Sequence, residues 1–475
     1  MKRALLAVFI LLVAITAASG YAASHRERAY RQLIDRGEAA LAKDDTFAAI
    51  EAFSGAIALK DNSMLGYLKR GEAYRRRHQL DSNPRAARPV ETLDPAADAA
   101  MRDLRRAAEL DPMAPRPLEL LGDINYALGR FDRASEHYQA YVKLDDRSPR
   151  VLYKLALAHY SAGRWAGAVA ALHQAIAIDD RFAEAYYLLG LCFRDLQRPG
   201  ESLRALQTSV RLAPAMLHAR EELGDLYGRL GRREDRLAQL EALSALDPGP
   251  SRQVTLGLAY ARAGQFGRAV ATLGQAAERY PDYSYTYVAL GRVWLEKGQP
   301  PDRMDLIKAL GALQEAVGTE DSSEALMLFG RALLLSHDDE LAEQVLTQAS
   351  AKRPVDPLAF YYLASAAERR GHLGAARRAL LDYRGLEGDD PDPRRRTAQA
   401  VRLANLSMKL GDGPDAVIWY RLALETSGTD ASLLVRLAEA QVLSGTRDDA
   451  RGTIARALEI EPENRAAAAL QRRLR

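Results

Sequence analysis

The side chains that most often do chemistry in proteins are sparse in this sequence of 475 residues. It holds one cysteine, Cys192, and eight histidines. His137, His159 and His173 lie within predicted helices, and none has a second histidine at the spacing of a metal site. Motifs of phosphate-binding loops, dinucleotide sites, serine hydrolases, zinc proteases and paired cysteines are absent. We therefore expect no catalytic residue, no metal ion and no cofactor, and we expect Cys192 to be buried rather than redox-active.

Two clusters of charge are the remaining candidates for binding chemistry. The acidic cluster consists of Asp389, Asp390 and Asp392. The basic cluster consists of Arg75, Arg76, Arg77, His78, Arg85 and Arg88. We interpret the first as a solvated loop and the second as a solvated helix end. The alternatives are calcium binding for the acidic cluster, and docking to an acidic partner or to lipid headgroups for the basic cluster.

A repeated unit must position any residue that binds or reacts. The stretch 149–216 contains two copies of this unit, and equivalent residues lie 34 positions apart. Ala168 corresponds to Ser202, and Leu172 corresponds to Leu206. Apolar residues recur within each copy at three- and four-residue steps, which predicts helices with one apolar face. A period of this length is typical of a helix–turn–helix repeat.

The second copy illustrates how one unit is built. Its spacing predicts one helix over 183–196 and another over 200–212. Gly190, Ser202 and Ser209 fall where the helices must approach closely, and a bulky side chain there would force them apart. A single helix pair cannot bury its apolar face alone, so neighbouring units must cover it.

This pattern resembles the tetratricopeptide-repeat family. The resemblance extends over almost the whole chain after its N-terminal segment, where the small positions align into twelve units. It implies an all-α fold, a right-handed solenoid of about twelve helix–turn–helix repeats with a C-terminal capping helix. The predicted organisation is repeats 1–10 over residues 30–390 with insertions near 77–96 and 299–305, a linker over 391–396, repeats 11 and 12 over 397–464, and the capping helix over 465–475.

Three places depart from the regular pattern. In the sixth unit, Arg236 stands where a small residue is expected, which predicts a more loosely packed helix pair. Pro300–Pro301 and the polar stretch Pro391–Arg396 interrupt helix stacking, and we expect hinges there. No stretch outside the units is long enough for a separate catalytic domain, so we predict that the chain is not an enzyme.

The resemblance also implies a binding groove. In this family the inner helices line a concave surface that binds extended peptides or partner helices. The implied groove residues of the third to fifth units are Tyr126, Arg150, Tyr153, Leu157, Tyr160, Glu184, Tyr187, Leu191 and Arg194. Those of the later units are Tyr285, Arg292, Arg331 and Tyr361. Tyrosine offers contact area with a polar end, which suits recognition surfaces. The alternative is that several of these side chains pack between repeats.

The N-terminus is typical of an export signal. Lys2 and Arg3 precede an apolar run, and small residues follow it. Residues 1–22 are therefore interpreted as a signal peptide, cleaved after Gly20 or Ala22, or as an uncleaved membrane anchor. Residues 4–23 are long enough for such a tether. The orientation of an anchor stays open, because arginines follow the apolar run as well.

A formal net charge of +3 argues against nucleic acid as a partner. We expect a non-enzymatic scaffold of a bacterial-type cell envelope or periplasm that binds segments of partner proteins or peptides in its concave groove. The alternative is a membrane-anchored accessory or assembly subunit of a complex for envelope polysaccharide or lipid biosynthesis, or for secretion. The expected location is periplasmic or secreted, with the inner membrane as the alternative.

Overall fold

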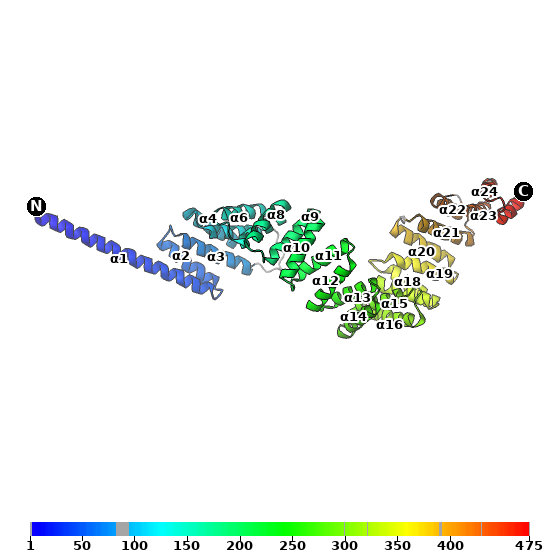
Figure 1. The fold of residues 1–475 in the computed structure, drawn as a ribbon, viewed down its shortest axis with the longest axis horizontal. Helices are drawn as coiled ribbons and strands as arrows, with labels where there is room; N and C mark the ends of the chain where they lie inside the picture. The colour runs from blue at the N-terminus through cyan, green and yellow to red at the C-terminus, as the bar shows by residue number, and fades with distance from the viewer. Residues whose placement is uncertain are drawn as a thin grey trace. The chain divides into compact units, whose positions relative to one another are not determined.

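The computed structural model describes residues 2–81, 95–298, 300–320, 322–388, 392–428 and 430–474, and every regular element in these ranges is an α-helix (Figure 1). The side chains of residues 2–11, 13–18 and 78–81 lie outside this description. The first helices of the repeats, the A helices, are α1 (Lys2–Leu41), α3 (Met64–Asp81), α5 (Pro115–Ala127), α7 (Pro149–Ser161), α9 (Ala183–Asp195), α11 (Leu217–Arg229), α13 (Pro250–Arg262), α15 (Ser284–Glu296), α17 (Ser323–Leu335), α19 (Pro357–Arg369), α21 (Pro393–Lys409) and α23 (Ala431–Leu443). The second helices, the B helices, are α2 (Thr46–Leu59), α4 (Pro95–Leu110), α6 (Phe131–Leu144), α8 (Trp165–Ile178), α10 (Pro199–Leu212), α12 (Arg233–Leu246), α14 (Phe266–Arg279), α16 (Arg303–Thr319), α18 (Asp339–Ala351), α20 (Leu373–Glu387), α22 (Gly413–Ser427) and α24 (Arg447–Ile460), and α25 (Arg465–Leu474) follows them.

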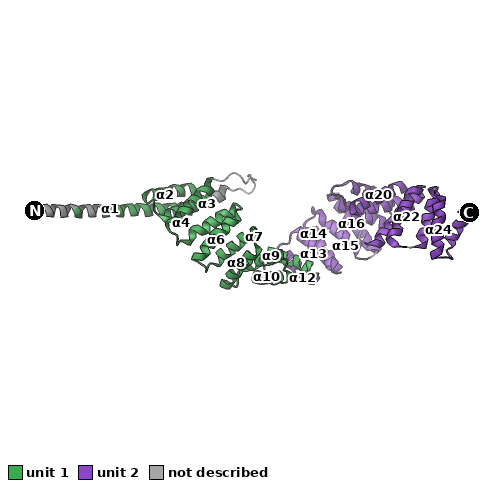
Figure 2. Cartoon of the chain, turned by 90° about the horizontal axis from the view of Figure 1, so that it is seen from above, with its two compact units in different colours: residues 1–231 green, residues 232–475 purple. Residues whose placement is uncertain are grey.

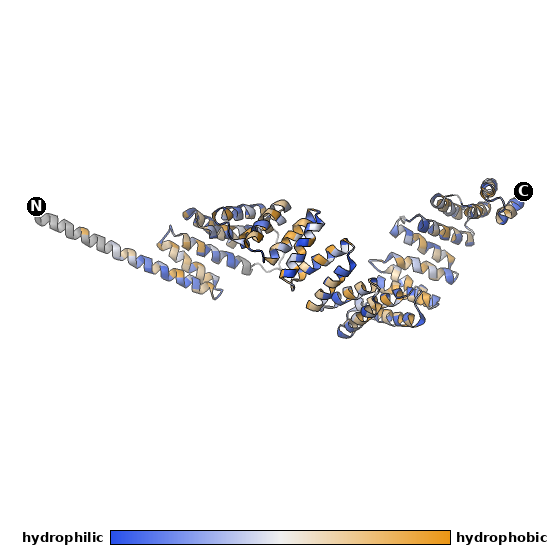
Figure 3. Cartoon of the chain, viewed as in Figure 1, coloured by the Kyte–Doolittle hydropathy of each residue, from blue (hydrophilic) through white to orange (hydrophobic). Residues whose placement is uncertain are grey.

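The chain divides into two compact units, residues Met1–Gly231 and Arg232–Arg475 (Figure 2). Unit 1 contains α1 to α11, and unit 2 contains α12 to α25. Within each unit, helices alternate between A and B and bury their apolar stripes against sequence neighbours (Figure 3). The predicted all-α repeat solenoid is confirmed. The boundary between the units falls inside the sixth repeat, where Arg236 replaces a small residue.

Close approach within a helix pair is clearest in the pair α9 and α10. A Cβ atom added at Gly190 would lie 2.6 Å from Cγ of Leu206, so only glycine fits this position. Ser202 Oγ donates a hydrogen bond of 2.8 Å to the carbonyl of Gly190, and Ser209 Oγ donates one of 2.9 Å to that of Ala183. Both serines are fully buried. The predicted role of the small residues is therefore confirmed.

The C-terminal helix α25 covers the last apolar face of unit 2. Ala467, Leu470 and Leu474 are buried and pack against α23 and α24. Arg451 of α24 donates hydrogen bonds of 3.1 Å and 2.8 Å to the carbonyl of Leu474. This carbonyl lies at the helix end, where it has no partner within its own helix. The predicted capping helix is confirmed.

Two predicted irregular segments are shorter than expected. The linker predicted over 391–396 is wrong for residues 393–396, which form the first turn of α21. Asp392 caps that turn by accepting a hydrogen bond from the backbone of Arg394, and Pro393 occupies the first helical position, where its missing N–H costs nothing. The insertion predicted over 299–305 likewise ends early, because Asp302 caps α16 and helix begins at residue 303.

The insertion predicted near 77–96 is also shorter, because α3 continues to Asp81 and α4 begins at Pro95. Residues 82–94 lie outside the described residues, and so do residues 389–391 with two members of the acidic cluster. At the N-terminus, α1 runs without a break from Lys2 to Leu41. Most side chains of the predicted signal or tether are outside the description. Within the part that is described, no helix is both long and apolar enough to cross a membrane.

Candidate partner-binding surfaces

Four tyrosines from three consecutive A helices of unit 1 lie near one another and are partly buried. We call Tyr126, Tyr153, Tyr160 and Tyr187 the tyrosine strip. The ring of Tyr153 packs against Phe182, with centroids 5.1 Å apart, at the junction to the next repeat. The hydroxyl of Tyr126 shares a hydrogen bond of 3.2 Å with Ser161 on α7. The strip therefore contributes to packing between repeats and leaves only part of each ring accessible.

Arg194 of α9 organises the polar end of the strip. Its Nη1 atom donates to both carboxylate oxygens of Glu222 on α11 at 2.9 Å, and its Nε atom donates to Asp195 at 2.8 Å. Its Nη2 atom donates to the hydroxyl of Tyr160 at 3.1 Å, and this hydroxyl donates to Asp195 at 2.9 Å. One guanidinium thus joins three successive A helices, a geometry that its planar fork of donors favours.

Burial raises the pKa of the strip tyrosines. The pKa of Tyr153 rises to about 12, first through burial and then through the nearby carboxylate of Glu184. The pKa of Tyr160 also rises to about 12, through burial and its hydrogen bond to Asp195. Both phenols are therefore neutral near pH 7 and can act as hydrogen-bond donors.

The other predicted groove residues of unit 1 fall into two groups. Leu157 is partly buried and Leu191 is only 9% exposed, so Leu191 packs between helices, as the alternative interpretation holds. Arg150 and Glu184 are exposed, and neither makes a hydrogen bond or ion pair with any described residue. They are charged groups that a partner can reach without breaking internal bonds.

Sequence reasoning missed a partly buried ion cluster beside the strip. Lys154 of α7 donates to Glu119 at 2.6 Å and to Asp123 at 2.8 Å, both on α5. Arg116 donates to Glu119 at 2.7 Å. Lys154 lies 35 residues after Glu119 and 31 after Asp123, about one repeat, so comparing charges at equivalent helix positions of neighbouring units is a signal that could have found these pairs. This cluster holds A helices together rather than offering a free charge.

The groove residues predicted for unit 2 do not form one surface of the same kind. Tyr285 is exposed and lies near the ring of Tyr283, with centroids 6.1 Å apart. Arg292 pairs with Glu324 on the next A helix. Arg331 lies 6.0 Å from the ring centroid of Tyr362, which the sequence analysis did not single out.

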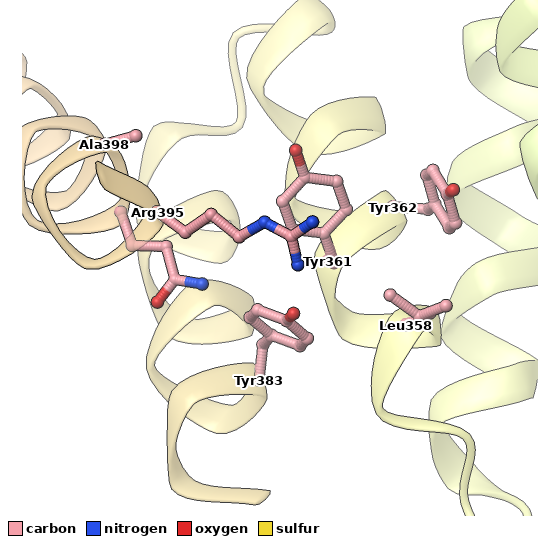
Figure 4. A pocket seen from close by; sticks show the side chains of 7 residues that line it. Leu358, Tyr361, Tyr362, Tyr383, Arg395 and Ala398 are labelled. Carbon is pink, nitrogen blue, oxygen red and sulfur yellow. The ribbon is translucent and has the colours of Figure 1, made fainter. Parts of the chain in front are cut away.

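Tyr361 lies in a distinct hollow, the tyrosine pocket, of about 290 Å³. We define it by Leu358, Tyr361 and Tyr362 of α19, Tyr383 of α20, and Arg395 of α21 (Figure 4). The ring of Tyr361 is 5.5 Å from that of Tyr362 and 5.4 Å from that of Tyr383, measured between centroids. The sequence analysis missed Tyr383, because it lies on a B helix, and Arg395, because its segment was assigned to a linker.

Cys192 is fully buried, and burial raises the pKa of its thiol to about 12, which suppresses the reactive thiolate. No group of three or more histidine, cysteine or acidic side chains is placed to hold a metal ion in the part of the chain that is described. What these surfaces offer is aromatic area, hydrogen-bond donors and charge.

Sequence comparisons identify the repeats. A family model described as "Tetratricopeptide repeat" matches residues 153–216 and 254–312, and one described as "TPR repeat" matches residues 122–163. No curated protein matches the chain.

Several solved structures are similar to the chain over part or most of its length. The crystal structure of YrrB, a TPR protein with an unusual peptide-binding site, is 21% identical, with 38% of this chain and 95% of that chain covered and a TM-score of 0.32. PilF of Pseudomonas aeruginosa is 18% identical, with coverage of 48% and 96% and a TM-score of 0.35. The Cut9–Hcn1 hetero-tetramer of the APC/C is 14% identical, with coverage of 94% and 96% and a TM-score of 0.36.

The family models match segments longer than one repeat in both compact units, and the helices pair in the way that the 34-residue period predicts. Members of this family are generally non-catalytic scaffolds for interaction with proteins or peptides. The chain therefore contains tetratricopeptide repeats over residues 122–216 and 254–312.

Proposed function

We propose that the chain is a non-enzymatic scaffold of a bacterial-type cell envelope, and that its tyrosine strip holds a segment of a partner protein. The tyrosine strip carries this proposal. Three consecutive A helices of unit 1 place aromatic rings next to one another, with the hydroxyl of Tyr160 held in a fixed network. Tyrosine rings fixed in this way lose little conformational entropy when a partner binds.

Charge beside the strip supports recognition of a polar partner segment. Arg150 and Glu184 are exposed on neighbouring A helices, and both lie free of partners among the described residues. A partner that crosses the strip could place an acidic group near the first and a basic group near the second. Such pairs at the rim of an interface steer orientation more than they add affinity.

The envelope location rests on the sequence of the N-terminus. A basic start followed by an apolar run and small residues favours export, and the same residues favour a tether if they are retained. We propose a periplasmic or secreted protein, with an inner-membrane tether through residues 4–23 as the alternative. N-terminal sequencing of the protein from fractionated cells distinguishes the two. Loss of about 22 residues from a soluble form supports cleavage, and an intact protein in washed membranes supports the tether.

Crosslinking in cells tests the proposed binding surface. A photoreactive residue is placed at Tyr153 or Tyr187, and a matched probe is placed at Ile178, an exposed residue at the end of a B helix. We expect a distinct crosslinked protein from the strip positions that is lost when the neighbouring strip tyrosines are changed to alanine. Equal products from all three positions, or none from the strip, would contradict the proposal.

A further inference from the structure

The solvent-facing side of α8 in unit 1 is uncharged along its whole length. Among the described B helices, α8 alone contains no aspartate, glutamate, lysine or arginine. Its buried residues are Ala168, Ala171, Leu172 and Ala175, and they occupy the opposite side of the helix. The outer side therefore lacks the charged groups that the other B helices expose to water.

Four exposed residues form one line along this outer side. The α8 stripe consists of Ala166, Ala170, His173 and Ala177. Successive members are four, three and four residues apart, which is the spacing of the contact seam between paired helices. Because three of the four are alanines, the backbone of a second helix can approach closely. Trp165 and Ile178 at the ends of α8 are 36% and 45% exposed and extend the apolar surface.

The neighbouring B helices carry charges at the equivalent positions. Helices α6, α8 and α10 follow one another along unit 1 (Figure 2). The residues 34 positions before the stripe, on α6, are Asp132, Glu136, Gln139 and Lys143. The residues 34 positions after it, on α10, are Gly200, Arg204, Gln207 and Arg211. All of them are exposed, so an uncharged centre lies between two polar borders, as in many protein interfaces.

The uncharged centre can face a copy of itself. A two-fold contact uses the same surface on both copies, so a charged centre would meet its own charge. If two α8 helices pack antiparallel about a two-fold axis that crosses them at mid-length, Ala166 lies opposite Ala177 and Ala170 lies opposite His173. The same axis places α6 over α6 and α10 over α10 of the second copy. No lysine, arginine or carboxylate is buried at the centre of this contact.

The borders distinguish the antiparallel arrangement from a parallel one. In the antiparallel arrangement, Lys143 lies opposite Asp132 of the second copy. Asp132 already pairs with Arg164, but its side chain is 76% exposed and stays within reach. Arg211 lies opposite Gly200, and the inner border positions place a charged residue opposite a glutamine. A parallel arrangement would put α6 over α10 and Lys143 over Arg211, and like charges opposite each other disfavour a contact.

We propose that two copies of the chain associate through the α8 stripe, with the α8 helices antiparallel and with α6 and α10 forming the borders. Three 14-residue helices, each about 21 Å long and about 9 Å from the next, cover at most roughly 1,100 Å² on both copies together. This area is at the low end for specific complexes, so the association is weak and reversible. The tyrosine strip lies on A helices, and this inference does not rest on its proposed function.

Sedimentation of the purified full-length chain over a range of concentrations tests the association. We expect the mass to rise from one chain towards two between about 1 μM and about 500 μM, the range in which weak complexes form. Ala170→Glu puts a charge at the centre of the stripe and should weaken the association at least roughly tenfold. A single-chain mass at every concentration overturns the inference.

Ala271→Glu is the matched control. Ala271 is exposed and is the sixth residue of α14, as Ala170 is of α8, so the change is the same at the same place of another B helix. It should leave the association unchanged, and equal weakening by both variants would contradict the assignment to the stripe. Hydrogen exchange of α7 to α10 establishes that Ala170→Glu retains its helices.

Mixing two variants tests whether α8 faces α8. In the antiparallel arrangement the two Ala170 positions lie about one helical turn apart along the helices, close enough for opposite charges to attract. Ala170→Glu and Ala170→Lys should each be mainly single chains, and an equimolar mixture should recover the association. A mixture that stays dissociated would contradict the contact between two copies of this helix.

Failure of this contact can be distinguished from failure of the proposed function. The double variant Tyr153→Ala and Tyr187→Ala should associate like the original chain, because neither tyrosine lies on α6, α8 or α10. Ala170→Glu should in turn keep the crosslink from the strip to its partner protein. Loss of the association in the tyrosine variant would place the contact on the strip and overturn the assignment to α8.

Discussion

Tyrosines of the A helices have different surroundings in the two units. In unit 1, Tyr160 is bonded to Asp195 and Arg194 of the following A helix, so it links adjacent repeats. In unit 2, Tyr361 faces Tyr383 and forms a wall of an open hollow. The following A helix accounts for part of this difference. α9 has 13 residues like α7 before it, whereas the additional turn of α21 brings Arg395 to the pocket.

Tyrosine on an A helix can therefore either stabilise the contact between repeats or remain accessible to a partner, depending on its neighbours. A polar end that is already bonded within the chain gives up existing hydrogen bonds when it binds a partner, which costs free energy. The hydroxyl of Tyr361 makes no hydrogen bond with a described residue and has no such cost. We therefore expect changes of Arg194 and Asp195 in unit 1 to act mainly on stability.

The largest effect on unit 1 should come from Gly190→Leu. The added side chain collides with Leu206, because even its Cβ atom would lie 2.6 Å from Cγ of that residue. Overpacking of this kind costs roughly 1–3 kcal/mol or more. In an array, stability is a sum of local and nearest-neighbour contributions, so hydrogen exchange should show the loss in α9 and α10 and leave α19 to α24 protected.

Gly200→Leu is the matched control for this prediction, because a Cβ at Gly200 of α10 has no heavy atom within 4 Å. It should leave protection of the pair α9 and α10 unchanged or slightly raised, since leucine favours helix more than glycine does. Equal loss of protection in both units after Gly190→Leu would contradict the picture of locally determined stability.

Removal of the guanidinium of Arg194 should have the next largest effect. Arg194→Ala leaves Glu222 and Asp195 without their charged partner. We expect a loss of about 1–2 kcal/mol in the free energy of opening of α9 and α11, measured by hydrogen exchange, because hydrogen bonds to charged groups are worth about that much or more. Arg150→Ala, which removes an exposed arginine from the same face, should change this free energy of opening by less than about 0.5 kcal/mol. Similar losses of opening free energy in both variants would contradict the assignment of Arg194 as a structural link between A helices.

Lowering the pH should reduce the stability of unit 1 by protonating Glu119. Burial alone would raise its pKa, but hydrogen bonds and charge from Lys154 and Arg116 hold the pKa below its ordinary value of 4.5. Stability from a carboxyl with a lowered pKa is fully present above the unfolded value and is lost as pH falls through the folded value. Amides of α5 and α7 should therefore lose protection as pH falls below 4.5. The Glu119→Gln variant should be less stable at pH 7 and should lack this part of the acid dependence. If protection of α5 and α7 fell with pH identically in both proteins, the ion cluster would not be the cause.

A smaller effect is expected from the cap of α21. Asp392→Ala removes the hydrogen bond to the backbone of Arg394, which should cost about 0.5–2 kcal/mol in the first turn. Hydrogen exchange should therefore become faster in the first turn of α21, while unit 1 keeps its protection. Asp392→Asn retains a capping oxygen and should behave nearly like the original protein in both regions. If the alanine and asparagine variants were indistinguishable, the turn would not depend on its cap.

The regular part of this molecule follows from its sequence. Small residues recur at the positions of Gly190 and Ser202, and leucine recurs at that of Leu206, because the distance between two packed helices restricts side-chain size; Arg236 in the sixth unit is an exception. The tyrosine pocket was not predicted, because it depends on a departure from that period. The pair Asp392–Pro393 resembled a polar linker, although a capping residue followed by proline is also a helix start, as it is at Asp356–Pro357.

The hydrogen bonds of Arg194 were likewise not predicted from the sequence. Its position implies a groove-facing charge, but whether such a charge is free depends on Glu222 of the next A helix and on Asp195 beside it. A single sequence shows that opposite charges occur in neighbouring repeats and does not show which pairs meet. The helices are therefore predicted by local pattern, and the accessible binding groups are decided by contacts between repeats.

The most direct test of the proposed scaffold function is the affinity of the purified chain for the partner segment captured through Tyr153 or Tyr187. Affinity for that segment should fall more than about tenfold in the double variant Tyr153→Ala and Tyr187→Ala, because aromatic anchors dominate binding energy at interfaces. Tyr285→Ala, which removes an exposed tyrosine from unit 2, should leave the affinity for the segment unchanged. Equal affinities of the double variant and the original protein would contradict the proposal that the tyrosine strip holds the partner.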